Sequence, residues 1–233
     1  MMIGNHSIFN HPKTLYHKLR SACHEDWQRY CHHNFVQGIA DGSLPIENFK
    51  HYLKQDYLFL MHFARAYSLA AVKADDLDDM KMAAKSAQHT LTTEMSLHVD
   101  YCSQWGLKAQ DIINEPEAIA NIAYTRYVLE RGVSGDILDL YTALSPCAVG
   151  YAEIGHRLIN DSKTVFEGNP YLKWIETYGS NEFLASAVDQ IEMLEKLSLK
   201  RLTSKRLASL SQTFHTATRL EIGFWDMGWH CAY

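Results

Sequence analysis

The chain has 233 residues, 47% of them apolar, which suits one large domain or two small ones with a sizeable core. Its 22 basic residues are outnumbered by 27 acidic ones, and the formal net charge of −5 gives no sign of a nucleic-acid-binding surface. The five cysteines are scattered and form no CxxC pair, which indicates a reduced chain and not a disulfide scaffold or a zinc ribbon.

Two kinds of segment are missing from the sequence. No apolar run approaches the roughly 18 residues that a membrane span needs. Residues 1–6 show no apolar run behind a basic head, so no signal peptide is evident. We therefore expect a cytoplasmic protein without a membrane partner.

Helical periodicity dominates the chain, and its few prolines and glycines fall mostly between the periodic stretches. Gly38, Gly42 and Pro45 predict a loop, and Pro45 suits the first turn of the helix that follows. The expected helices, in chain order, cover residues 14–33, 45–74, 75–106, 116–132, 134–160, 170–178, 180–199 and 203–229. No alternating strand, repeat or low-complexity linker is evident. The sequence therefore predicts an all-α bundle that forms a single domain over residues 1–233.

Cys147 directly follows Pro146, the one proline placed deep inside a helical pattern. A proline there removes a backbone donor and clashes with the preceding turn, so we expect a kink. Tyr151 lies one turn beyond Cys147 on the same face. A thiol beside a phenol at a kink suits the wall of a pocket and a nucleophile. The alternative is an inert buried thiol, because free cysteines commonly pack as small hydrophobes.

Asp56 is the one acidic residue between Glu47 and Asp75, and it lies in an apolar, aromatic stretch with Phe59 on the same face. A bare buried carboxylate costs several kcal/mol, so it needs a partner. That partner is either a structural ion pair or hydrogen bond, or a polar ligand.

Near the C-terminus, Glu221, Phe224 and Trp225 share a helix face, and Gly223 and Gly228 allow a close approach. Desolvation beside aromatic rings raises the pKa of a glutamate, which suits a proton donor near neutral pH. The alternative is a surface glutamate with core aromatics beside it.

Three tyrosines, Tyr124, Tyr151 and Tyr178, are ambiguous when each is taken alone, because tyrosines in helical chains are commonly packing residues. Together they are able to line a flat slot with polar edges, since tyrosine offers both an aromatic face and a hydroxyl.

One metal pattern is present. Glu153-x-x-His156 has the Glu-x-x-His spacing of di-iron carboxylate bundles, which need two such pairs. The nearest second candidate, Glu94-x-x-x-His98, has the wrong spacing. We therefore expect no metal site, and a metal-dependent oxidase stays open as an alternative.

Taken together, these segments resemble the TenA family, also called thiaminase II or aminopyrimidine aminohydrolase. The matching segments run in family order over nearly the whole chain: residues 35–45, 52–57, 94–98, 124–126, 144–147, 174–179 and 221–225. The resemblance implies a haem-oxygenase-like helical fold without haem or another cofactor, a homotetramer, and a role in thiamin salvage.

The resemblance also implies roles for individual residues. Cys147 places the chain in the cysteine-containing branch and looks like the nucleophile, with Glu221 as the acid/base. Asp56 would accept hydrogen bonds from the amino edge of an aminopyrimidine. The other substrate-binding residues implied are Phe59, Tyr124, Tyr151, Tyr178 and Phe224. Phe59 stands where the family often has a tyrosine, so its role is limited to stacking.

The implied reaction replaces an amine or thiazole leaving group on the pyrimidine's methylene by hydroxyl. A thiolate that adds to the ring supplies the electrons, and protonation of a ring nitrogen eases the addition. The implied substrates are 4-amino-5-aminomethyl-2-methylpyrimidine and thiamin. A non-catalytic pyrimidine-binding protein is a further alternative.

Overall fold

The computed structural model describes residue 9, residues 11–106 and residues 109–233. This part of the chain contains helices and no strand, which confirms the all-α prediction. Each of its helices is too short or too polar to cross a lipid bilayer. Residues 1–6, on which the expectation about a signal peptide rests, lie outside the described residues.

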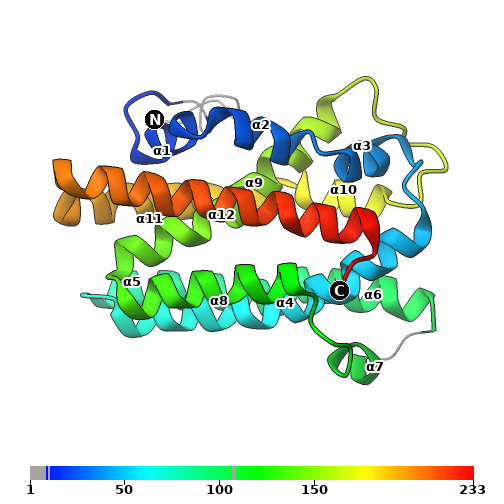
Figure 1. The fold of residues 1–233 in the computed structure, drawn as a ribbon, viewed down its shortest axis with the longest axis horizontal. Helices are drawn as coiled ribbons and strands as arrows, with labels where there is room; N and C mark the ends of the chain where they lie inside the picture. The colour runs from blue at the N-terminus through cyan, green and yellow to red at the C-terminus, as the bar shows by residue number, and fades with distance from the viewer. Residues whose placement is uncertain (1–8, 10, 107–108) are drawn as a thin grey trace.

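Two layers of long helices run side by side in Figure 1. The first contains α4 (Ile46–Lys73) and α8 (Ile119–Ser134), and the second contains α11 (Asn181–Arg201) and α12 (Ser204–His230), while α9 (Ile137–Asn160) crosses obliquely behind α12. α12 packs against both α8 and α9, so it joins the layers. The remaining elements are α1 (Leu15–Ala22), α2 (His24–Cys31), α3 (Asn34–Asp41), α5 (Leu77–His89), η1 (Thr90–Glu94), α6 (Met95–Gln104), α7 (Ala109–Ile113) and α10 (Leu172–Tyr178).

Side chains at the N-caps explain where several helices begin. The Asp136 side chain accepts hydrogen bonds from the backbone N–H groups of Leu138 and Asp139. The Asp139 side chain in turn accepts one from the backbone N–H of Asp136, which completes a capping box before α9. The caps of four other helices use Thr14, Asp76, Ser180 and Thr203. These starts agree with the sequence prediction to within three residues.

Several predicted boundaries were wrong. The helix expected over residues 14–33 is two helices, broken at Cys23. Gly38 lies inside α3 and not in a loop, because Phe35, Val36 and Ile39 bury one helical face there. A Cβ at Gly38 would lie 3.1 Å from the Leu44 backbone, so glycine lets the following turn fold back.

Other differences concern interruptions. The helix expected over residues 75–106 contains η1, a single π-helical turn between α5 and α6. The helix α7 was not predicted, and α8 continues past Gly132 to Ser134. α9 continues without a break through Pro146, and the kink expected near this residue stays a prediction.

Gly155 positions α10 against α9. A Cβ there would overlap the carbonyl carbon of Tyr178 and the amide nitrogen of Gly179. The contact brings the C-terminal end of α10 onto the turn of α9 that follows Tyr151. The buried aromatic core of the bundle continues from this point through Trp174 and Trp225.

Candidate active site

The eight residues singled out from the sequence are all buried. They come from five helices: Asp56 and Phe59 from α4, Tyr124 from α8, Cys147 and Tyr151 from α9, Tyr178 from α10, and Glu221 and Phe224 from α12. The interactions described below connect all eight in one cluster at the centre of the bundle.

Cys147 and Glu221 meet between α9 and α12, where a hydrogen bond links the thiol and the carboxyl group. The hydroxyl of Tyr124 donates a second hydrogen bond to Oε1 of Glu221, at 2.8 Å. Glu221 is 1% exposed, so the surface alternative for this residue was wrong. The thiol and the carboxyl group are placed for direct proton exchange.

Burial dominates the electrostatics of this pair. It raises the pKa of Glu221 to about 8; the negative charge of Asp56 adds to the rise, while hydrogen bonds from Tyr124 and Cys147 oppose it. Burial also raises the pKa of Cys147 well above its usual value, and the charge of Glu221 adds to this. At neutral pH both groups therefore carry their protons.

Asp56 lies in a hydrogen-bonded network of its own. Its Oδ2 accepts a hydrogen bond from the Tyr52 hydroxyl at 2.9 Å and lies 2.7 Å from Nε2 of His98. Trp174 Nε1 donates to Tyr52 at 3.2 Å, and the Tyr52 hydroxyl lies 3.5 Å from that of Tyr151. Among the described residues, both of these bonds to the carboxyl group use Oδ2, so Oδ1 is left for a ligand.

His98 helps to orient the carboxyl group of Asp56. Its Nδ1 lies 2.7 Å from the backbone carbonyl of Glu94, and a carbonyl only accepts, so Nδ1 donates this hydrogen bond. The opposite ring nitrogen, Nε2, faces Oδ2 of Asp56. The carboxyl group of Asp56 is therefore held by two side chains, Tyr52 and His98, in one orientation.

Aromatic rings form the walls of the cluster. The Phe59 ring centroid lies 5.1 Å from that of Tyr124 and 5.4 Å from that of Phe224. On the other side, the ring centroids of Tyr151 and Tyr178 are 4.9 Å apart. Within the described chain no group hydrogen-bonds the buried hydroxyl of Tyr178, so this hydroxyl is available to a ligand.

A small cavity of about 20 Å³, enough for about one water-sized molecule, lies beside Cys147 and Tyr151. Its other lining residues come mainly from α4, α5, η1 and α11: Phe63, Tyr67, Ser86, His89, Thr90, Glu94, Ala148, Phe183 and Ser186. Cys147 therefore borders this cavity, and both alternatives for its thiol, a nucleophile and an inert buried group, stay open.

Sequence reasoning missed four participants: Tyr52, Glu94, His98 and Trp174. All four lie within segments that carried the family resemblance. Tyr52 stands four residues before Asp56, one helical turn away, and this spacing was a usable signal. Glu94 and His98 had been weighed only as an incomplete metal motif.

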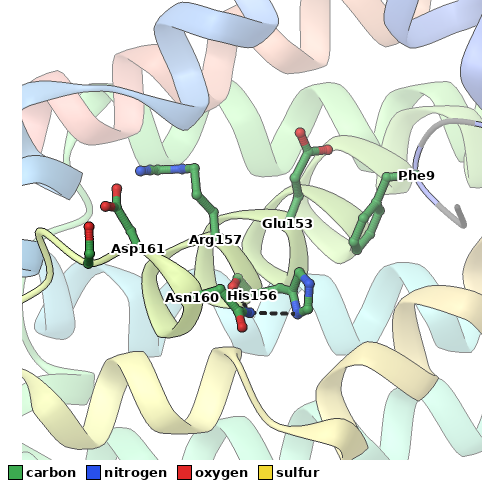
Figure 2. A pocket seen from close by; sticks show the side chains of 7 residues that line it. Phe9, Glu153, His156, Arg157, Asn160 and Asp161 are labelled. Carbon is green, nitrogen blue, oxygen red and sulfur yellow. Dashed lines mark hydrogen bonds between the residues drawn. The ribbon is translucent and has the colours of Figure 1, made fainter. Parts of the chain in front are cut away.

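The other metal candidate lies elsewhere, on the outer face of α9. Figure 2 shows Glu153 and His156 in a surface pocket with Phe9, Arg157, Asn160 and Asp161. Glu153 forms an ion pair with Arg20, and Asn160 Nδ2 lies 3.5 Å from His156 Nδ1. In the described part of the chain, no group of three or more His, Cys, Asp or Glu side chains is arranged to bind a metal ion.

Comparison with known proteins decides the family. A model of the TENA/THI-4/PQQC family matches residues 20–230. The chain belongs to the TENA/THI-4/PQQC family. Among relatives in this family, an uncharacterized protein of Haemophilus influenzae is 45% identical over 87% of this chain and 93% of its own length. An aminopyrimidine aminohydrolase of Halalkalibacterium halodurans is 38% identical over 93% of this chain and 94% of its own length.

Solved structures agree with this assignment. A TenA family transcription regulator from Silicibacter superposes with a TM-score of 0.86 at 41% identity, covering 92% of this chain and 96% of that one. A Shewanella denitrificans domain of unknown function with a haem-oxygenase-like fold gives a TM-score of 0.71 at 15% identity, covering 91% of each chain. The TENA/THI-4/PQQC chain therefore has the haem-oxygenase-like fold that the resemblance implied.

Proposed function

We propose that this protein is an aminopyrimidine aminohydrolase of the thiaminase II type that acts in thiamin salvage. Its substrates are 4-amino-5-aminomethyl-2-methylpyrimidine and thiamin, and its product is the hydroxymethyl pyrimidine. The observation that carries the proposal is the hydrogen-bonded pair of Cys147 and Glu221 beside a small cavity. The relative from Halalkalibacterium halodurans, named aminopyrimidine aminohydrolase, supports the same activity.

The first step moves a proton through Glu221. With its pKa near 8, Glu221 is a carboxylic acid at neutral pH and gives its proton to a ring nitrogen of the pyrimidine. The carboxylate that remains takes the proton of the Cys147 thiol while sulfur bonds to the ring carbon next to the substituted one. The thiol is therefore ionised only when the ring is ready to accept it.

The second step breaks the bond between the methylene and its leaving group. The ring, now an electron-rich enamine, supplies the electron pair that expels the amine or thiazole. Water adds to the methylene carbon, and the proton it loses goes to the departing amine or, when thiazole leaves, to solvent. As the ring becomes aromatic again, the sulfur leaves and takes a proton from the Glu221 carboxylic acid, and the ring nitrogen gives its proton to the Glu221 carboxylate. Glu221 takes back a proton, which its intermediate pKa allows.

Asp56 orients the substrate. Its Oδ1 would accept hydrogen bonds from the amino edge of the pyrimidine, while Tyr52 and His98 fix Oδ2. The rings of Phe59 and Phe224 would stack against the pyrimidine, and Tyr124, Tyr151 and Tyr178 would line its edges. This arrangement sets the distance from sulfur to carbon, on which the rate of addition depends.

Three further properties belong to the proposal. The family resemblance supports a homotetramer and a cytoplasmic location. One hydrophobic core cluster that extends from α1 to α12 supports the organisation of the chain as a single domain.

The test is product release by the purified protein from the aminomethyl pyrimidine and from thiamin, measured side by side. Turnover of either substrate to the hydroxymethyl pyrimidine is the expected result. Calorimetric binding of the pyrimidine without turnover would contradict the enzyme and favour the binding-protein alternative. Turnover that requires iron or manganese would favour the oxidase.

A further inference from the structure

Glu94 is a buried carboxyl group that the steps above do not use. It closes η1, the π-helical turn that interrupts the run from α5 to α6. Such single turns are rare and are often found at functional sites. Glu94 is 8% exposed and lines the same cavity as Cys147. The interruption therefore places a second acid beside the proposed nucleophile.

The carboxyl group of Glu94 has no basic partner among the groups that shift its pKa. Its side chain bonds the Thr90 hydroxyl, and the negative charge of Asp56 acts on it. Burial is the largest influence and raises the pKa of Glu94 to about 8. At neutral pH Glu94 is thus a carboxylic acid, ready to donate a proton.

The position of Glu94 in the cavity suggests which part of a substrate it meets. Asp56, Tyr124 and Glu221, which would hold the ring, do not line this cavity, whereas Cys147 and Tyr151 border it. From Cys147 the cavity is continued by side chains of α5, η1 and α11, among them Ser86, Thr90 and Ser186. The polar half of the cavity is therefore the place for the substituent that leaves the ring.

We propose that Glu94 protonates the amine leaving group. This inference rests on the proposed hydrolase activity and names a second acid for it. The Glu94 carboxylic acid gives its proton to the aminomethyl nitrogen, and the carbon–nitrogen bond breaks with its electron pair on nitrogen, so ammonia leaves. The Glu94 carboxylate then takes a proton from the water whose oxygen bonds to the methylene carbon.

The two substrates differ in their need for this proton. An amine is a poor leaving group unless nitrogen is protonated. The thiazolium of thiamin already carries a positive charge and leaves as neutral thiazole, without a proton. A role for Glu94 as the leaving-group acid therefore predicts an effect on one substrate and not on the other.

The test compares Glu94→Gln with wild type on both substrates. Gln has the shape of the protonated acid and should keep the fold. We expect kcat/KM for the aminomethyl pyrimidine to fall about 100-fold, in the range found for general acids, and that for thiamin to fall less than about threefold. Glu130→Gln, on the exposed face of α8, is the matched control and should leave both unchanged.

Glu94→Asp keeps a titratable acid and should recover part of the amine activity. Equal losses on both substrates, or an unchanged rate with the amine, would overturn the role of Glu94. Should Glu94→Gln unfold, an Asp variant that loses activity equally on both substrates would overturn it as well. Wild-type protein that hydrolyses neither substrate would instead overturn the proposed function, which is a distinguishable result.

Discussion

Tyr124 on α8 donates a 2.8 Å hydrogen bond to Oε1 of Glu221 on α12, although 97 residues separate them in the chain. The bond spans the contact between the two layers of the bundle. It favours the ionised carboxylate and so opposes the rise in pKa that burial imposes on Glu221. The balance of these two effects sets the pH at which Glu221 can give and retake a proton.

Tyr124→Phe should raise the pKa of Glu221 above about 8, because the ionised form loses a donor. A hydrogen bond to a charged group contributes about 1.5–3 kcal/mol, which corresponds to a shift of about one to two pH units. With thiamin as substrate, the fall of kcat/KM at high pH should move upward by that amount. An unmoved or lowered limb in the pH profile would contradict this.

Asp56→Asn should shift the same limb in the opposite direction. The charge of Asp56 raises the pKa of Glu221, so its removal should bring the fall in kcat/KM to lower pH. The variant also loses a carboxylate acceptor for the substrate's amino group, and we expect kcat/KM to drop about 100-fold, mostly through KM. The pH profile and KM of Asp56→Asn, measured beside those of Tyr124→Phe, test both signs together.

The contribution of Glu221 to the stability of the protein should fall as pH rises from 5 to 8. The unfolded chain ionises Glu221 near pH 4.5, whereas the folded chain keeps it neutral to about pH 8, so the folded state binds more protons in this window. Each such group costs up to about 1.4 kcal/mol per pH unit there. Above pH 8 both states are ionised and the slope ends.

Glu221→Gln removes this titration and should make the slope of stability against pH less negative, as measured by urea unfolding at pH 5.5 and pH 7.5, while Glu94 keeps its own contribution. The control Glu130→Gln changes an exposed carboxylate and should keep the wild-type slope. An identical slope in Glu221→Gln and wild type would mean that Glu221 does not fold as a neutral acid.

Two glycine substitutions should have opposite effects on stability. A Cβ at Gly155 would overlap the backbone of Tyr178 and Gly179, so Gly155→Ala should lower the free energy of unfolding by about 1–3 kcal/mol. A Cβ at Gly223 has no neighbour within 4 Å, and Ala favours a helix interior by up to about 1 kcal/mol. Gly223→Ala should therefore raise the free energy of unfolding. Chemical denaturation of both variants measures these changes, and a change in the same direction for both would contradict the prediction.

The helices and the site were predictable to different degrees. Caps such as Asp136 and periodic apolar residues act locally, so most helix starts followed from the sequence. The break at Cys23 and the π turn at residues 90–94 did not, because tertiary packing decides them and single-residue patterns do not. Gly223 and Gly228 look alike in the sequence. A Cβ added at Gly228 would overlap the Phe35 ring, whereas a Cβ at Gly223 would meet no neighbouring atom within 4 Å.

Each candidate site residue, taken alone, allowed both a structural and a functional interpretation. The hypothesis of an aminopyrimidine hydrolase came from the ordered set of segments that resemble the family. Which groups share a hydrogen bond depends on how α4, α6, α8 and α12 pack together. The contact between His98 and Asp56 crosses 42 residues, and no spacing rule reaches that far. Glu94 was weighed only as part of a metal pattern, because its place in the cavity beside Cys147 depends on the π turn that it ends, and the sequence did not predict this turn.

The central claim is that Cys147 is the nucleophile, and Cys147→Ser tests it most directly. The control is Cys231→Ser, which changes the exposed cysteine at the end of α12. We predict that Cys147→Ser loses turnover of both the aminomethyl pyrimidine and thiamin by about 10³-fold or more while its thermal unfolding is unchanged, and that Cys231→Ser keeps wild-type rates. Wild-type turnover by Cys147→Ser on either substrate would contradict the account.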